Sequence, residues 1–138
     1  MDIEQSFVTY LKTVTELSTV GSRIYPAQLP KKPTYPAITY SYISESETET
    51  LRTIDENLIS SVFEFSSWAP AEAQSRTIAK AIWGAFKNFQ GEMGGTNGVY
   101  VSSISKINKF ADTERDNDGV VIVCRTAQEF EITHRGGD

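Results

Sequence analysis

The chain has 138 residues, a mass of 15.3 kDa and a formal net charge of −5. Its length suits one domain around a single core, and 39% hydrophobic with 22% charged residues excludes a disordered chain. The excess of carboxylates argues against tight nonspecific binding to duplex DNA, which depends on Lys and Arg displacing counterions. The single cysteine, Cys124, excludes an internal disulfide.

Residues 3–20 are predicted to form an amphipathic helix. Apolar side chains recur there every three or four positions, which places them on one stripe; they are Ile3, Phe7, Tyr10, Leu11, Val14 and Leu17. Asp2 followed by Gln5 is typical of a capping box, and Gly21 supplies a stop. Beyond it, residues 21–36 hold four of the five prolines, which predicts a stiff, extended crossing from this helix to the first strand. Such a crossing is either a simple surface connection or an assembly surface.

Two strands are predicted next. Alternation in residues 36–44 places Ile38, Tyr40 and Tyr42 on one face, where we expect core packing. Residues 58–69 are rich in β-forming side chains and make the second strand. Between the two strands lies an acidic segment with five carboxylates and one arginine, which predicts a solvated loop or hairpin tip.

The second half of the chain is predicted to repeat the same order of elements, one helix followed by two strands. Residues 70–89 are predicted as a helix with Pro70 at its first position, and the glycine-rich residues 90–98 as the turn that follows. Residues 99–107 and 120–132 are the last two strands, and we expect residues 133–138 to form a loose tail. The predicted order is therefore α-β-β-α-β-β in one domain spanning residues 1–138.

Catalytic and metal-binding patterns are weak. His134 lies in the predicted tail and Cys124 on the inner face of a strand, so we expect a buried structural thiol and no Cys–His nucleophile. Residues 114–119 resemble a calcium loop, but Arg125 stands where that loop requires a glutamate. The glycine-rich turn lacks the Gly-Lys-Ser/Thr ending of a phosphate-binding loop. The sequence therefore predicts no catalytic residue, metal or cofactor.

Three strings resemble a known group of proteins. They are "VGSRIYP" (20–26) after an amphipathic helix, "VFEFSSWA" (62–69) on a strand, and "PAEAQ" (70–74) at the start of a helix. With the order of elements, they make the chain similar to the tail-completion proteins of long-tailed phages, which include tail terminators and tail-to-head joining proteins. The resemblance covers nearly the whole chain, to about residue 132.

The resemblance implies an α+β fold with a small, mainly antiparallel sheet, here of four strands, flanked by two amphipathic helices. It also implies a structural virion protein without enzymatic activity, made in the bacterial host cytoplasm and placed at the head-tail interface. Similar proteins are monomers that form a hexameric ring on the head-proximal end of the tail tube. Their partners are the tail tube protein and the head-tail connector (stopper) protein. DNA passes through the ring without specific binding, and no membrane is involved.

The acidic segment is the candidate assembly surface, because its composition is poor core material and suits polar contacts. Its charged residues are Glu45, Glu47, Glu49, Arg52, Asp55 and Glu56. Two alternatives stay open. One is another neck or head-completion protein of the virion, and the other is a small ligand-binding or enzymatic domain that uses the acidic turn at residues 112–118.

Overall fold

The computed structural model describes residues 2–47, 58–115 and 122–135. Two α-helices, one short 3-10 helix and six strands are found in these ranges. In chain order they are α1 (Ile3–Leu11), η1 (Thr15–Leu17), β1 (Ile24–Pro26), β2 (Ala37–Glu47), β3 (Leu58–Ala69), α2 (Glu72–Phe86), β4 (Gly91–Met93), β5 (Val99–Arg115) and β6 (Ile122–Arg135).

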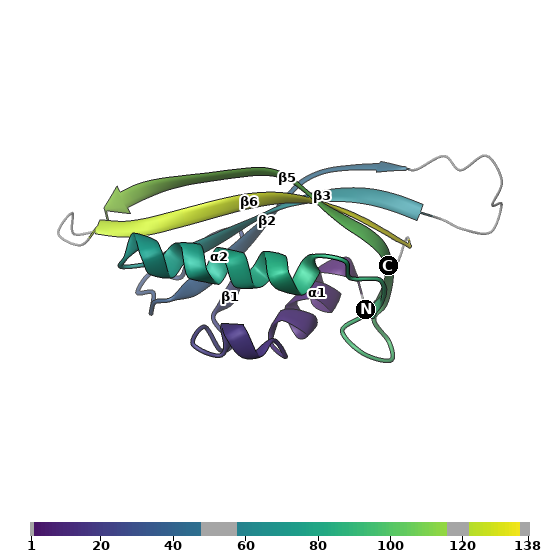
Figure 1. Cartoon of the computed structure of the whole chain (residues 1–138), viewed down its shortest axis with the longest axis horizontal. Coiled ribbons are helices and arrows are strands. Elements are labelled where there is room, and N and C mark those ends of the chain that lie inside the picture. The colour runs from purple at the N-terminus through teal and green to yellow at the C-terminus, as the bar shows by residue number, and fades with distance from the viewer. Residues whose placement is uncertain (1, 48–57, 116–121, 136–138) are drawn as a thin grey trace.

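The strands form one six-stranded sheet in the order β1-β2-β3-β6-β5-β4. β1 runs parallel to β2, and every other pair of neighbours is antiparallel. The sheet curves along its length, and both α-helices lie on its concave side (Figure 1). Within the described residues, no helix lies on the other face of the sheet.

The prediction of a four-stranded sheet in the order α-β-β-α-β-β is therefore wrong. The four long strands overlap the predicted ranges, but the sheet is mixed and carries two additional edge strands, β1 and β4. Each is three residues long, too short to show an alternating pattern, and they have the sequences IYP and GEM. Their extended form comes from pairing with Ile38–Tyr40 of β2 and Val99–Val101 of β5.

The first helix is shorter than predicted. Its capping box is confirmed: Asp2 Oδ1 accepts from the Gln5 amide at 2.8 Å, and Gln5 Oε1 accepts from the Asp2 amide at 3.0 Å. The helix ends at Leu11 because the β-branched residues 13–15 follow, and the Thr13 hydroxyl donates to the Tyr10 carbonyl at 2.6 Å. The chain then turns through η1.

The proline-rich crossing begins as strand β1 and is held at both ends by one arginine. The guanidinium of Arg23 donates to the carbonyl of Pro36 at 2.9 Å and to that of Thr19 at 2.5 Å. Ile24 is buried at 8% exposure and belongs to the hydrophobic core, so it anchors the crossing. The arginine therefore links the end of the helical region to the start of β2.

The predicted loose tail is wrong for residues 133–135, which complete β6. His134 pairs with both Ile59 of β3 and Val101 of β5, and it is only 3% exposed. β5 is also longer than predicted and runs to Arg115, so the start of the acidic turn is strand. Polar residues extend these strands because a long neighbouring strand supplies backbone hydrogen bonds: β3 pairs with residues 133–135 of β6, and β6 pairs with residues 108–115 of β5.

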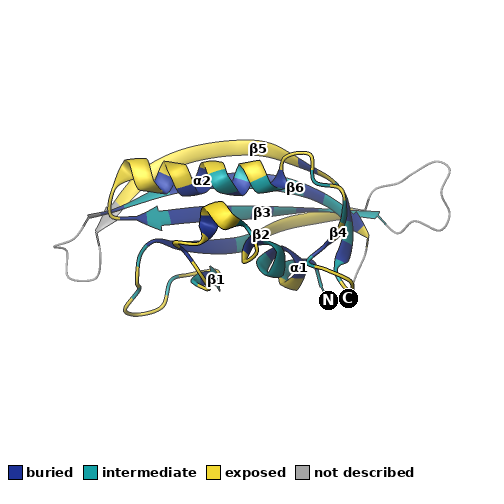
Figure 2. Ribbon diagram, turned by 60° about the horizontal axis from the view of Figure 1, so that its bottom comes forward, coloured by how far each residue is buried: buried dark blue, intermediate teal, exposed yellow. Residues whose placement is uncertain are grey.

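The core consists of aromatic side chains from both helices packed on the concave face. The Phe7 ring meets those of Tyr40, Phe63 and Phe65 edge-on, with centroids 4.9–5.0 Å apart. Phe86 of α2 meets Phe65 in the same geometry at 5.4 Å. Figure 2 shows the result: buried residues are concentrated in the central strands, while most of β5 is exposed.

Replacement of Phe86 by alanine tests this packing. Phe86 is fully buried and also contacts Phe130 at 5.3 Å, so Phe86→Ala is expected to lower the free energy of unfolding by about 3–5 kcal/mol. Urea unfolding followed by tryptophan fluorescence measures the change. The control is Gln74→Ala on the exposed face of the same helix, where we expect a change within about 0.5 kcal/mol. Equal effects of the two variants would contradict the packing.

Candidate functional site

The sheet has two open edges. β1 covers β2 only as far as Tyr40, and β4 covers β5 only as far as Val101. In the described parts of the chain no strand pairs with the outer side of residues 41–47 or 102–115. We call these stretches the β2 edge and the β5 edge. Their outward backbone groups are free to pair with another chain, as unpaired strand edges generally are.

The large exposed hydrophobic side chains of the described residues lie on these two edges. Tyr42 and Ile43 on the β2 edge are 56% and 48% exposed, and Ile107 and Phe110 on the β5 edge are 51% and 36% exposed. Register shifts fall at Tyr42/Ser44 in β2 and at Lys106/Asn108 in β5, so each edge has a bulge beside its exposed isoleucine. Bulges and exposed apolar groups on an unpaired edge are typical of an interaction surface.

The structure corrects the prediction for Tyr42 and supports it for Tyr40. Tyr40 is 8% exposed and packs against Phe7. Tyr42 is 56% exposed, although its ring still meets that of Phe63 at 5.7 Å between centroids. The alternating pattern correctly placed both rings on one face of the strand. It could not indicate which part of that face is buried.

Two of the six residues of the predicted acidic surface fall within the structure. Glu45 is exposed on the β2 edge and pairs with Ser61, while Glu47 is the last residue of the same strand and pairs with Ile59. Glu49, Arg52, Asp55 and Glu56 lie outside the described residues. The predicted surface therefore begins on the β2 edge.

The face of the sheet without helices carries a cluster centred on Arg125. Its guanidinium donates to both carboxylate oxygens of Asp112, at 3.0 and 2.7 Å, and lies 3.7 Å from Glu64. The same group lies 5.5 Å from the Trp68 ring and 5.3 Å from the Phe110 ring. Arg125 thus joins β3, β6 and β5, and it engages the first carboxylate of the predicted acidic turn.

A search of the described residues finds no group of three or more His, Cys, Asp or Glu side chains placed to hold a metal ion. The rest of the acidic turn, residues 116–118, lies outside the described ranges. Cys124 is half-buried, less than predicted, with its sulfur 3.9 Å from the carbonyl oxygen of Pro70. None of the helices described is both long enough and apolar enough to cross a membrane.

A serine and a histidine form a buried pair that sequence reasoning missed. Nδ1 of His134 lies 2.7 Å from the carbonyl oxygen of Arg135, so Nδ1 carries the proton and Nε2 accepts from the Ser61 hydroxyl at 2.8 Å. Ser61 is 1% exposed, which keeps a substrate from its oxygen. The pair joins β3 to β6. Burial lowers the pKa of His134, while the Arg135 carbonyl and the charge of Glu45 oppose that shift.

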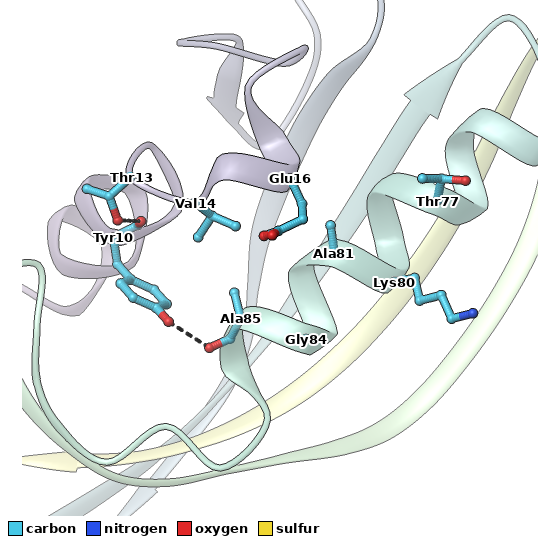
Figure 3. Close-up of a pocket in the computed structure, with 9 residues that line it drawn as sticks. All are labelled: Tyr10, Thr13, Val14, Glu16, Thr77, Lys80, Ala81, Gly84 and Ala85. Atoms are coloured by element: carbon cyan, nitrogen blue, oxygen red, sulfur yellow. Dashed lines mark hydrogen bonds between the residues drawn. The ribbon is translucent and has the colours of Figure 1, made fainter.

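A recess lies between the α1–η1 region and α2 (Figure 3). It has a volume of about 720 Å³, and its walls are mainly apolar or small side chains such as Val14, Ala81 and Gly84. The Tyr10 hydroxyl is engaged, because it donates to the Ala85 carbonyl at 2.8 Å. Glu16 and Lys80 are the charged residues of its lining, which holds no pairing of a nucleophile with a base.

No family model matches the chain, and no curated protein matches its sequence. Among solved structures, its fold is similar to that of a chain in the virion of a native gene transfer agent (GTA) particle. The TM-score is 0.59 at 15% sequence identity, and the alignment covers 97% of this chain and 98% of that chain. The two chains share one fold.

His134 predicts a specific dependence of stability on pH. The folded protein holds the ring with a pKa below its ordinary value of 6.5, so the unfolded chain binds a proton more readily. The free energy of unfolding is therefore expected to have its full value above pH 6.5 and to fall as the pH drops toward the lowered pKa of His134. Urea unfolding at pH 7.5 and 5.5 measures this loss, and His134→Gln should reduce it. An equal loss of stability in His134→Gln would show that other titratable groups cause the pH dependence.

Proposed function

We propose that this protein is a structural component of a virion, namely a tail terminator or tail-to-head joining protein of a long-tailed phage or related particle. It caps the head-proximal end of the tail tube as a hexameric ring and has no enzymatic activity. The observation that carries the proposal is the likeness, over nearly the full length of both chains, to a chain in the virion of a gene transfer agent particle. The strings at residues 20–26 and 62–74 resemble tail-completion proteins and support it independently.

The open edges supply a way to build the ring. The β2 and β5 edges are different surfaces, so a contact between the β2 edge of one copy and the β5 edge of the next is head-to-tail. Three antiparallel pairings separate β2 from β5 within the sheet, so these strands run in opposite directions. Joined edge to edge, neighbouring copies continue one antiparallel sheet. A head-to-tail contact of this kind closes into a ring when the rotation between copies allows it.

The composition of the edges suits assembly that needs a template. Each edge carries two large exposed hydrophobic side chains, and the other exposed residues there are mainly polar or charged. Edges of this kind associate weakly by themselves, as small polar interfaces do. We therefore propose that free subunits are monomers and that the tail tube protein brings them together. The completed ring presents a surface to the head-tail connector, and the acidic balance of the chain lets DNA pass without binding.

The edge isoleucines test the proposal. Ile43→Arg and Ile107→Arg are both exposed changes, so each is expected to alter the free energy of unfolding by no more than about 0.5 kcal/mol. Each should nevertheless impair joining, because a charge at an edge blocks pairing with another strand. The measurement is complementation of a genome that lacks this gene, with free tails and DNA-filled heads counted by electron microscopy.

Lys87→Glu, an exposed change just after α2, is the matched control and should complement normally. Normal particle yield from both folded isoleucine variants would remove the two edges from the assembly. Free tails joined normally to heads in the complete absence of the gene would refute the joining function itself.

A further inference from the structure

A basic groove lies between α2 and β5. Its volume is about 410 Å³, and its lining includes four cationic side chains: Arg76 and Lys80 from the helix, and Lys106 and Lys109 from the strand. No carboxylate is part of that lining, although Glu72 lies 3.3 Å from Arg76 at an exposed position. The chain as a whole has a net charge of −5, so this concentration of positive charge is local. A groove of this kind favours an anionic partner.

The lining of the groove also includes a buried amide without a partner. Gln128 of β6 is 1% exposed, and within the described residues neither Nε2 nor Oε1 has a hydrogen-bond partner. An unpaired buried amide is costly, and native structures that keep one usually satisfy it with a ligand, a water or another chain. Gln128 requires both an acceptor and a donor. A phosphate oxygen supplies only the acceptor, whereas a segment of polypeptide supplies both.

The groove is continuous with the β5 edge, because Lys106 and Lys109 belong to that strand. Lys106 pairs with Phe130 and lies 5.0 Å from the Trp83 ring of α2, and Lys109 pairs with Gln128, so both point to the helix side of the sheet. An extended chain added to the β5 edge would place alternate side chains on this same side. The groove therefore suits a strand with acidic and hydroxyl-bearing side chains on one face.

The β2 edge of this protein is such a strand. Glu45 pairs with the buried Ser61, and Tyr42 contacts Phe63, so both side chains lie on the helix side of the sheet. Both are exposed. Glu45 supplies a carboxylate for the lysines, and the Tyr42 hydroxyl can both donate to and accept from an amide. Charge and hydrogen-bonding capacity therefore match across the two edges.

We propose that the basic groove and the β5 edge receive the β2 edge of a second copy, with Glu45 of that copy facing Lys106 and Lys109. This inference rests on the proposed ring and adds the residues that set its register. Backbone pairing holds the strands together, and the charges select the acidic β2 edge over other strands. Gln128 obtains its hydrogen bonds only in the assembled ring.

A charge exchange tests the pairing. Purified subunits are added to cognate tail tubes, and bound subunits are counted by sedimentation and electron microscopy. Glu45→Lys and Lys109→Glu should each reduce binding about tenfold through like-charge repulsion. The double variant restores opposite charges and should bind within about threefold of the wild type. Lys87→Glu controls for net charge, and circular dichroism confirms that each variant is folded.

Gln128→Leu provides a second readout. An apolar side chain removes the unpaired amide, so the free subunit should melt at a higher temperature while its binding to tubes decreases. A purely structural role would change stability alone.

The outcomes separate the two proposals. Suppose that wild-type subunits cap tubes. If the single variants then bind normally, or if the double variant does not recover binding, the groove pairing is overturned and the proposed ring is unaffected. Wild-type subunits that do not bind tubes would overturn both. If Lys109→Glu binds tubes as well as the wild type but binds a duplex oligonucleotide more weakly, the groove is a nucleic-acid site and the pairing with a second copy is overturned.

Discussion

The packing of aromatic rings on one face of the sheet is the constraint on which the rest of the molecule depends. Phe7 from α1 and Phe86 from α2 meet the same strand residue, Phe65, at 4.9 and 5.4 Å. Helices that pack on one face bury only that face, so the opposite face and both edges of the sheet must be stabilised by other means. The positions of the exposed and polar features follow from this one-sided arrangement.

Polar interactions hold the elements that the aromatic core does not reach. On the uncovered face, Arg125 joins three strands through Asp112, Glu64 and two aromatic rings. At the far end of β6, the Ser61–His134 pair continues the sheet beyond the apolar core. These contacts link neighbouring strands outside the aromatic core.

The two open edges of the sheet are not explained by composition or by core packing. A monomer with two unpaired strand edges is at risk of uncontrolled association, and proteins usually protect such edges with charges and bulges. Here the bulges are present, Glu45 of the β2 edge is opposite in charge to Lys106 and Lys109 of the β5 edge, and exposed isoleucines remain beside them. In the ring that we propose, that combination would limit pairing to the correct partner edge.

The sequence by itself determined the elements whose side chains repeat with a clear period. Helical spacing identified the buried stripe of α2, alternation identified the four long strands, and the capping box marked the start of α1. It also indicated the acidic character of the surface that begins at Glu45. These features are local, because each depends on neighbours within one or two turns or along one strand.

Only the tertiary structure decided the features that depend on partners distant in the chain. β1 and β4 are strands because β2 and β5 supply their hydrogen bonds. His134 is buried between β3 and β5, and its ring bonds to the hydroxyl of Ser61, which is 73 positions away in the chain. The basic groove likewise joins lysines of β5 to an arginine of α2 and a glutamine of β6. No local pattern records such contacts, since their energy comes from pairing and burial after the chain has folded.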